Sequence, residues 1–214
     1  MSPGILRLFL QFLVLFPRSQ DCALSGTRAW NDQLINVLPN CEVAASSPDG
    51  RRHVQIDPSG RISVATTPNR TVPGNFKPVD PPAMFSWAPN SRAFFVNDGE
   101  GSGQTSVFRM FKISGAQISE DSAIHQAVVT IFRGIKKCES RAVDPDVWGF
   151  GWSTDGKRVY LLVQTTIHEP CGRPASFVSF VVNVGDGKVI ERFSESRTRS
   201  TFHRLLPPAV IKYE

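Results

Sequence analysis

Ser46-Ser47-Pro48-Asp49-Gly50-Arg51 is the first of three stretches that repeat one short pattern along this chain. The other two are Trp87-Ala88-Pro89-Asn90-Ser91-Arg92 and Trp152-Ser153-Thr154-Asp155-Gly156-Lys157. Each stretch precedes a run of β-branched and aromatic residues, which is typical of a tight turn that leads into a strand. The repetition therefore predicts a series of β-meander units, with one turn of this kind in each unit.

The spacing of the turns predicts the size of the units and an insertion between two of them. The interval from Asp49 to Asn90 fits one four-stranded propeller blade, which takes about 40–45 residues, and the interval from Asn90 to Asp155 is longer. Apolar residues recur at helical spacing between Ser119 and Lys137, after a start rich in capping residues. We therefore predict a helix inserted at about 119–137, with one face covering a free sheet edge through Ile124, Val128, Ile131 and Ile135.

Composition agrees with a folded, strand-rich chain. Of the 214 residues 41% are hydrophobic, and 15 Phe and 4 Trp are enough for one good-sized core. The 16 Gly and 16 Pro are spread along the chain, as many short strands joined by tight turns require. The predicted fold class is mostly β, with antiparallel meander units of β-propeller type, about three of them recognisable, and one inserted α-helix. We assign residues 26–196 to this domain and 197–214 to a C-terminal tail.

The first 25 residues have the pattern of an export signal. Arg7 precedes the apolar run Leu8–Phe16, Pro17 ends it, and the small-residue site Ala23-Leu24-Ser25 follows. The run is shorter than the roughly 20 apolar residues that cross a bilayer. A buried N-terminal strand or helix is the alternative. The pattern predicts cleavage near Gly26, a periplasmic or secreted mature chain, and no membrane span after cleavage.

The three turn stretches resemble the WD40-like (PD40) repeat of TolB-type β-propeller proteins, which carries Trp-Ser-Pro-Asp-Gly-Lys before an apolar strand. The second copy departs from it with Asn90-Ser91 in place of Asp-Gly, and the first has Ser46 in place of Trp. The resemblance covers about half of the chain and implies a periplasmic or cell-surface scaffold. It brings no catalytic residues, because the repeat positions are structural: Asp49, Gly50, Trp87, Asn90, Trp152, Asp155 and Gly156. Both indoles should be buried between units, each with an acceptor for its N–H.

Three units are fewer than a closed propeller requires, since such rings have about four to eight blades. The chain could contain a further degenerate unit, form an open curved sheet, or complete itself as a homo-oligomer. These three alternatives remain open at the level of sequence.

The four cysteines fit an oxidising compartment. Cys138 and Cys171 flank the third unit, and we predict a disulfide between them. Cys22 would leave with the signal peptide, and Cys41 would then be a buried thiol. Alternatively, cleavage lies upstream and Cys22 pairs with Cys41.

Candidates for chemistry are few. His168, Glu169 and Cys171 lie close together, but a metal site needs three or four converging ligands, and no partner pair with a recognisable spacing occurs elsewhere. Asn97–Gly101 resembles a calcium loop in composition but lacks the full ligand series. Asp144 and Asp146 flank Pro145 and suit a turn better than a glycosidase pair. The sequence therefore predicts no cofactor and no metal.

Two function classes remain. We favour an exported, non-enzymatic binding or scaffolding module of the cell envelope, which binds another protein or an envelope component through the loops Asn97–Gln104 and His168–Pro174. The alternative is a hydrolase or lyase whose site would bring Asp144, Asp146, His168 or Glu169 together in one pocket. The net charge is +5, but the basic residues are scattered apart from Arg133–Lys137 and the tail cluster Arg192, Arg197, Arg199 and Arg204, so nucleic acid is not a predicted partner.

Overall fold

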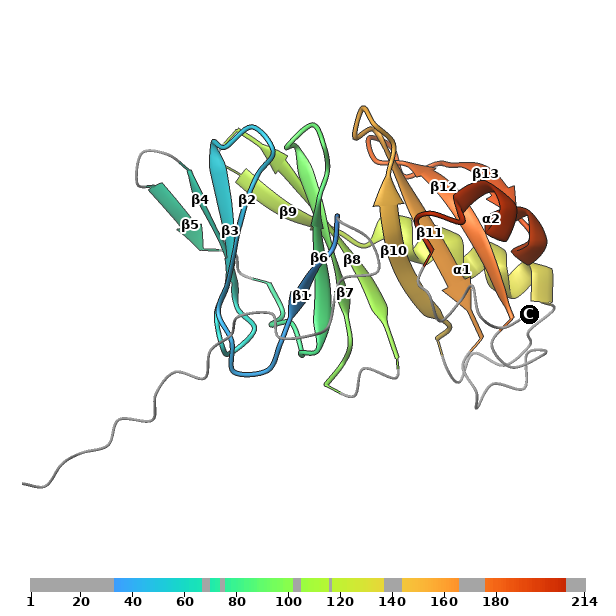
Figure 1. The fold of residues 1–214 in the computed structure, drawn as a ribbon, viewed down its shortest axis with the longest axis horizontal. Helices are drawn as coiled ribbons and strands as arrows, with labels where there is room; N and C mark the ends of the chain where they lie inside the picture. Colours follow the sequence, from blue (N-terminus) through green and yellow to red (C-terminus); the bar gives the residue numbers. More distant parts are fainter. Residues whose placement is uncertain are drawn as a thin grey trace, which may run out of the picture.

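The computed structural model describes residues 33–66, 70–73, 76–101, 105–115, 117–136, 144–165 and 176–206. Within these residues most of the chain is strand, arranged in three antiparallel sheets together with two helices (Figure 1). The prediction of a mostly β chain made of antiparallel units is therefore confirmed. In the described part of the chain the three sheets do not close into a ring.

Each repeat unit supplies the strands of one sheet. Sheet I has the order β2-β3-β4-β5, with strands Val43–Ser46, Arg52–Ile56, Ile62–Thr66 and Arg70–Pro73. Sheet II has the order β1-β6-β7-β8-β9, with strands Ile35–Val37, Ala83–Trp87, Ala93–Asp98, Val107–Ser114 and Gln117–Asp121. Sheet III has the order β10-β11-β12-β13, with strands Asp146–Trp152, Arg158–Gln164, Phe177–Asn183 and Val189–Phe193. The short strand β1 was not predicted and extends sheet II beyond β6.

The three sheets stack face to face with sheet II in the middle (Figure 1). Strand β7 is buried along its whole length, because alternate side chains enter two different cores. Phe94 and Val96 pack towards sheet I, whereas Ala93 and Phe95 pack towards sheet III. Since successive side chains of a strand point to opposite faces, the sequence Ala-Phe-Phe-Val is what a central sheet with two buried faces requires.

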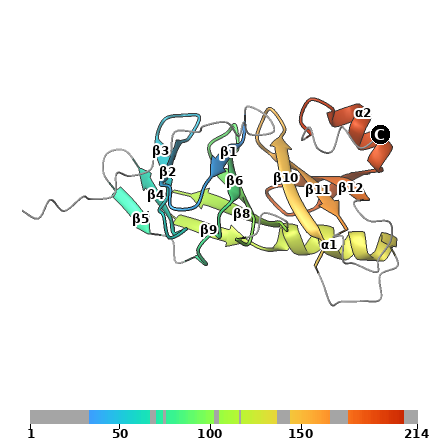
Figure 2. The same cartoon turned by 60° about the horizontal axis from the view of Figure 1, so that its bottom comes forward.

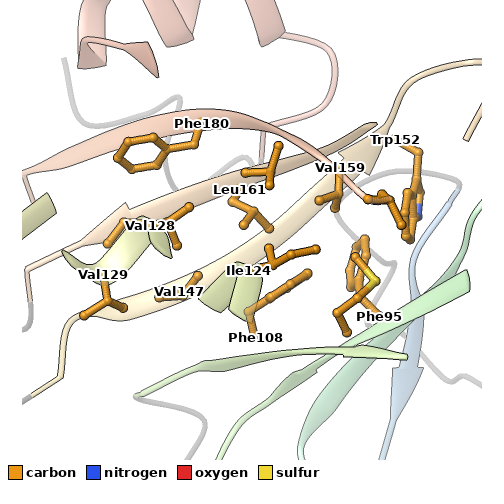
Figure 3. Close-up of a cluster of buried hydrophobic side chains, with 14 of the residues drawn as sticks. Phe95, Phe108, Ile124, Val128, Val129, Val147, Trp152, Val159, Leu161 and Phe180 are labelled. Carbon is orange, nitrogen blue, oxygen red and sulfur yellow. The ribbon is translucent and has the colours of Figure 1, made fainter. Parts of the chain in front are cut away.

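Helix α1 (Ala123–Lys136) lies beside sheets II and III and fills the space between them (Figures 2 and 3). Its buried residues are Ile124, Val128, Val129 and Phe132. The predicted face was therefore half wrong, because Ile131 and Ile135 are 36% and 37% exposed. The helix also begins four residues later than predicted, since residues 117–121 pair with β8 as an edge strand. The acidic start that resembled a capping segment still contributes, because Asp121 Oδ1 accepts a 2.9 Å hydrogen bond from Ala123 N.

The pH dependence of stability should report the packing of α1. Burial lowers the pKa of His125 below the ordinary value of 6.5, although the charge of Asp144 and a hydrogen bond with the backbone of Phe108 act in the opposite direction. Because the pKa is lower in the folded state, the unfolded state takes up the proton first as pH falls below 6.5, and stability is lost there. For one proton the slope cannot exceed about 1.4 kcal/mol per pH unit.

Urea unfolding at pH 7.0 and pH 5.5 measures this effect. The wild-type protein should lose stability between the two values, and His125→Gln should lose less. Equal losses in both proteins would show that His125 does not titrate in this window.

Helix α2 (Glu195–Phe202) covers the outer face of sheet III and was not predicted. It lies across the boundary at which the sequence analysis placed the C-terminal tail, and it begins at the N-cap Ser194. Thr198 is fully buried, and its hydroxyl lies 2.6 Å from Ser179 Oγ on β12. A third cluster gathers under the helix, made of Phe150, Leu162, Phe177 and Leu206 together with the partly buried Trp148, Tyr160, Phe202 and Leu205.

The opposite end of the stack is a polar sheet face. On the outer side of sheet I, Ser46 is exposed and His53 and Gln55 are half-buried, and Ser46 Oγ lies 3.0 Å from His53 Nδ1. Ser46 occupies the place that Trp87 and Trp152 hold in the other two units, so unit 1 has no indole to pack against a preceding unit. A polar outer face is typical of the terminal unit of a repeat stack.

Candidate binding groove between two units

The first and third repeat turns have the same internal hydrogen bonds. In the first and third turns a serine hydroxyl donates to an aspartate two residues later, from Ser47 to Asp49 and from Ser153 to Asp155, each at 2.6 Å. Each aspartate also accepts the backbone N–H two residues further on, and these hydrogen bonds lower the pKa of both carboxyls below 3.8. The turns also need a positive φ, which is 68° at Gly50, 60° at Ser91 and 65° at Gly156.

Neighbouring turns are hydrogen-bonded to one another. Asp49 N donates to Ser91 Oγ at 3.0 Å, which joins the first turn to the second. Asn90 Nδ2 donates to Asp155 O at 3.2 Å and to Gly156 O at 2.9 Å, which joins the second turn to the third. Asn90, the residue that departs from the Asp-Gly pattern, is therefore the one that binds the next turn. An aspartate there could not donate these two bonds.

The repeat tryptophans join the same units inside the stack. Trp87 is 9% exposed, and its Nε1 donates to Ala45 O at 3.0 Å. Trp152 is 4% exposed, and its Nε1 donates to Ser86 Oγ at 3.0 Å. Ala45 and Ser86 occupy the same position of the repeat, so each indole reaches the equivalent point of the preceding unit. Both indoles are buried and hydrogen-bonded, as expected from the sequence.

A groove with a volume of about 410 Å³ lies beside the junction of the second and third turns. Its lining comes from the second turn, the β8–β9 hairpin, the third turn and the β12–β13 turn: Asn90, Arg92, Ala93, Lys112, Ile113, Ser114, Ser119, Gly156, Lys157, Asn183, Val184 and Gly185. Three of these residues are basic and none is acidic. The groove therefore offers a positively charged wall with hydroxyl and amide groups beside it.

The three basic residues differ in how they are held. Lys112 Nζ lies 2.6 Å from Asp121 Oδ2 and donates to Gly185 O at 3.2 Å, so Lys112 connects sheet II to the β12–β13 turn. Arg92 and Lys157 are exposed, and neither forms a salt bridge with any described carboxylate. Asp155 interacts electrostatically with Lys157, and its carboxylate also accepts hydrogen bonds within its own turn.

The backbone on both sides of the groove is fixed. Arg92 O accepts from Ile113 N at 2.9 Å, and Lys157 O accepts from Val184 N at 2.9 Å. Gly156 lies against Asn90 so closely that a Cβ at this position would be 2.7 Å from the Asn90 side chain. Arg92 and Lys157 thus project from a preorganised frame, which reduces the conformational entropy that a ligand must overcome.

One sequence pattern points to the groove, although the groove was not predicted from it. All three turns carry a basic residue two positions after the Asp or Asn: Arg51, Arg92 and Lys157. Because the turns are hydrogen-bonded in series, these residues follow one another along one side of the stack.

A second cavity, of about 170 Å³, lies at the β1–β6 edge and is lined by Asn36, Val37, Leu38, Pro82, Ala83, Met84, Asn97, Gly99 and Trp148.

The described part of the predicted acidic loop is structural. Asn97 is buried, and its side chain forms two hydrogen bonds with the backbone of Gly149, of 2.8 and 2.7 Å, which join sheet II to β10. Gly149 is required there, because a Cβ would lie 2.8 Å from the rings of Phe95 and Phe108. Residues 102–104 of the loop lie outside the described residues.

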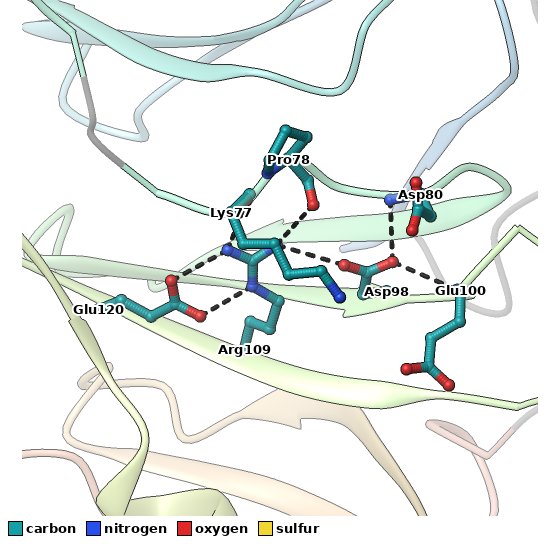
Figure 4. A network of polar contacts seen from close by, with 7 residues as sticks. All are labelled: Lys77, Pro78, Asp80, Asp98, Glu100, Arg109 and Glu120. Carbon is teal, nitrogen blue, oxygen red and sulfur yellow. Dashed lines mark hydrogen bonds and ion pairs between the residues drawn. The ribbon is translucent and has the colours of Figure 1, made fainter.

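Asp98 belongs to a buried ion-pair network centred on Arg109 (Figure 4). Arg109 is 6% exposed; its guanidinium donates to Asp98 Oδ2 at 3.2 Å and contacts both carboxylate oxygens of Glu120, at 2.8 and 2.9 Å. It also donates to the backbone carbonyls of Lys77 and Pro78. Burial disfavours the charged guanidinium, but the two carboxylates outweigh this effect and raise the pKa of Arg109. The network attaches the segment between units 1 and 2 to sheet II.

The residues that would serve a hydrolase do not meet in the described structure. Asp144 pairs with Arg133 at 2.6 Å, and the buried Asp146 accepts a hydrogen bond from Ser106 N at 2.9 Å. Neither aspartate lines either of the two cavities above. His168, Glu169 and the rest of the loop His168–Pro174 lie outside the described residues. Among the residues that the structure describes, no group of three or more His, Cys, Asp or Glu side chains could hold a metal ion.

Of the four cysteines, only Cys41 lies among the described residues. Cys138 and Cys171 lie outside the described residues, so their disulfide stays a prediction. Cys41 is half-buried and disulfide-bonded rather than free, which excludes the alternative of a buried thiol. The export signal at 1–25 also lies outside the described range. No helix in the part of the chain described here is both long and apolar enough to cross a membrane.

The basic cluster near the C-terminus is partly neutralised. Arg197 pairs with Glu191 at 2.7 Å and lies over the ring of Phe193, and Arg199 pairs with Glu195 at 2.7 Å. Only Arg192 and Arg204 of the four are exposed without a salt bridge among the described residues.

No protein-family model matches this chain, and no curated protein matches it significantly.

Proposed function

We propose that this chain is a non-enzymatic binding module that is exported to the cell envelope, and that its ligand occupies the groove between the second and third turns. The three sheets act as a rigid propeller-type stack of TolB-like WD40 units, open rather than closed. Support for the repeat comes from the equivalent hydrogen bonds of Trp87 and Trp152 and from the turn-to-turn bonds of Ser91 and Asn90.

The groove is the observation that carries the binding proposal. It joins two exposed basic side chains, Arg92 and Lys157, on backbone that is fixed by inter-unit hydrogen bonds. A cavity of about 410 Å³ lies in the size range of small-molecule sites. Asp144 and Asp146, the described carboxylates of the enzyme alternative, are engaged elsewhere, by Arg133 and by Ser106.

Thermal unfolding in the presence of a soluble envelope extract from the native host tests this function. A ligand that binds only the folded state stabilises it by RT ln(1 + [L]/Kd) and so raises the melting temperature. The wild-type protein should melt at a higher temperature in the extract than in buffer. The double variant Arg92→Gln/Lys157→Gln should show no such rise, and Arg192→Gln, an exposed arginine on β13, should behave as wild type.

Two results would contradict the proposal. The extract could leave the melting temperature of the wild type unchanged. It could also raise the melting temperature of the double variant by as much as that of the wild type, which would place the ligand elsewhere.

A further inference from the structure

We infer that the groove binds a small oxyanion with two or more negative charges, held between Arg92 and Lys157. This inference rests on the proposed function and adds the chemical class of the ligand. It is carried by the charge of the lining, by the fixed backbone from which the basic side chains project, and by the size of the groove.

The charge of the lining selects an anion. Arg92, Lys112 and Lys157 face the groove, and no acidic residue belongs to the lining. Asp121 pairs with Lys112 at 2.6 Å, so Arg92 and Lys157 are the basic side chains of the lining that form no salt bridge with a described carboxylate. Asp155 lies outside the lining; its charge interacts with Lys157 and also with Arg158, and its carboxylate accepts hydrogen bonds within its own turn. Asp186 lies 3.6 Å from Lys188. An anion with a single charge would satisfy only one of the two basic side chains.

The donors around the groove suit oxygen atoms. Arginine presents a planar fork that can hold a carboxylate or phosphate through two parallel hydrogen bonds, and lysine adds a mobile ammonium. The hydroxyls of Ser114 and Ser119, on the β8–β9 hairpin, also line the groove and supply further donors. Asn90 is not available as a donor, because its amide nitrogen is used by the third turn.

The position of the groove favours a small ligand over a long chain. Two hydrogen bonds between units lie beside the groove. Lys112 on sheet II donates to Gly185 O in the β12–β13 turn, and Asn90 in the second turn donates to Gly156 O in the third turn. A compact polycarboxylate or a phosphate ester provides the required charge within a small volume. Both sources share the chemistry of a multiply charged oxyanion.

Calorimetric titration at low ionic strength, with citrate and pyrophosphate as the two probes, tests the inference. At least one probe should bind the wild type with one ion per chain, and the preferred probe identifies a carboxylate or a phosphate source. Arg92→Gln and Lys157→Gln should each weaken binding by about tenfold, which is the size expected for a charge-assisted hydrogen bond. Added salt should weaken it further.

Matched variants separate a site from general attraction to a basic protein. Lys157→Arg preserves the charge and should retain binding, whereas Arg192→Gln removes the same charge outside the groove and should leave binding unchanged. All variants are at exposed positions, and unchanged melting temperatures without ligand will show that each is folded.

Three outcomes would overturn the inference. In the first, neither probe binds the wild type more tightly than it binds the double variant. In the second, Arg192→Gln weakens binding as much as the groove variants do. In the third, hexaglutamate binds the wild type but not the double variant, while citrate and pyrophosphate do not bind. If the extract raises the melting temperature but the probes do not bind, the proposed function stands and the oxyanion inference fails. If neither has an effect, both fail.

Discussion

Replacing Trp152 by alanine is expected to lower the free energy of unfolding by about 3–5 kcal/mol. The indole is 4% exposed and packs against Phe95 of sheet II, with ring centroids 5.2 Å apart. It lies in the core that joins sheets II and III and also holds the first turns of α1 (Figure 3). Truncation therefore leaves a cavity at the contact between two units rather than within one sheet.

Denaturant unfolding with a constant m value measures this loss. Trp87→Ala should cost a similar amount, because Trp87 occupies the same position in the preceding unit and packs against Phe85 and Phe94. Trp148→Ala is the matched control, since Trp148 lies on the same strand β10 but is partly exposed. Its loss should be clearly smaller.

Two further variants separate packing from hydrogen bonding. Ser86→Ala removes the acceptor and leaves the buried N–H unpaired while the indole stays in place, whereas Trp152→Phe removes the Nε1 donor together with part of the ring volume. Each should cost about 1–3 kcal/mol. A loss below about 1 kcal/mol for Trp152→Ala would contradict the inter-unit role of the indole, since core truncations of this size are rarely silent.

The sequence predicted the elements whose signals are local. The turns at Asp49, Asn90 and Asp155 and the strands that follow them were read correctly, because turn chemistry and alternation are local properties. Strand β9 and helix α2 were not predicted. Their sequences, Gln117–Asp121 and Glu195–Phe202, are mostly polar, and each element forms by packing or pairing with a sheet. Helix α2 is held by the buried Thr198 and by Phe202, whose partners lie on sheet III and are distant in the sequence.

The candidate groove required the tertiary arrangement. The basic residue in each turn was visible in the sequence, but its meaning depends on the series of hydrogen bonds that brings Arg92 and Lys157 to one groove. Asn97 and Asp98 illustrate the reverse case. Their composition resembled a metal-binding loop, yet Asn97 binds the backbone of Gly149 and Asp98 pairs with Arg109, eleven residues later in the chain.

The largest expected electrostatic effect concerns that pair. Replacing Arg109 by methionine should lower the free energy of unfolding by about 3–5 kcal/mol, because it leaves the charge of Asp98 buried without a cation. Asp98 is 4% exposed, and its other oxygen accepts hydrogen bonds from the backbone of Asp80 and Glu100. The carbonyls of Lys77 and Pro78 would also lose their donor.

Arg197→Met is the matched control for this substitution. Arg197 also pairs with a glutamate and also lies over a phenylalanine ring, but the pair is exposed, with the arginine and glutamate side chains 60% and 44% accessible. Because solvent screens exposed pairs, its loss should be below about 1 kcal/mol. The difference between the two variants isolates the effect of burial.

The double variant Arg109→Met/Asp98→Asn decides whether an uncompensated charge causes the loss. Asparagine keeps an oxygen for the backbone N–H groups of Asp80 and Glu100 but carries no charge, so the double variant should be more stable than Arg109→Met alone. If the double variant is less stable than Arg109→Met, the loss arises from the freed carbonyls and from packing over Phe111 rather than from the charge. The free energies of unfolding of the wild type, Arg109→Met, Asp98→Asn and the double variant give the coupling between Arg109 and Asp98.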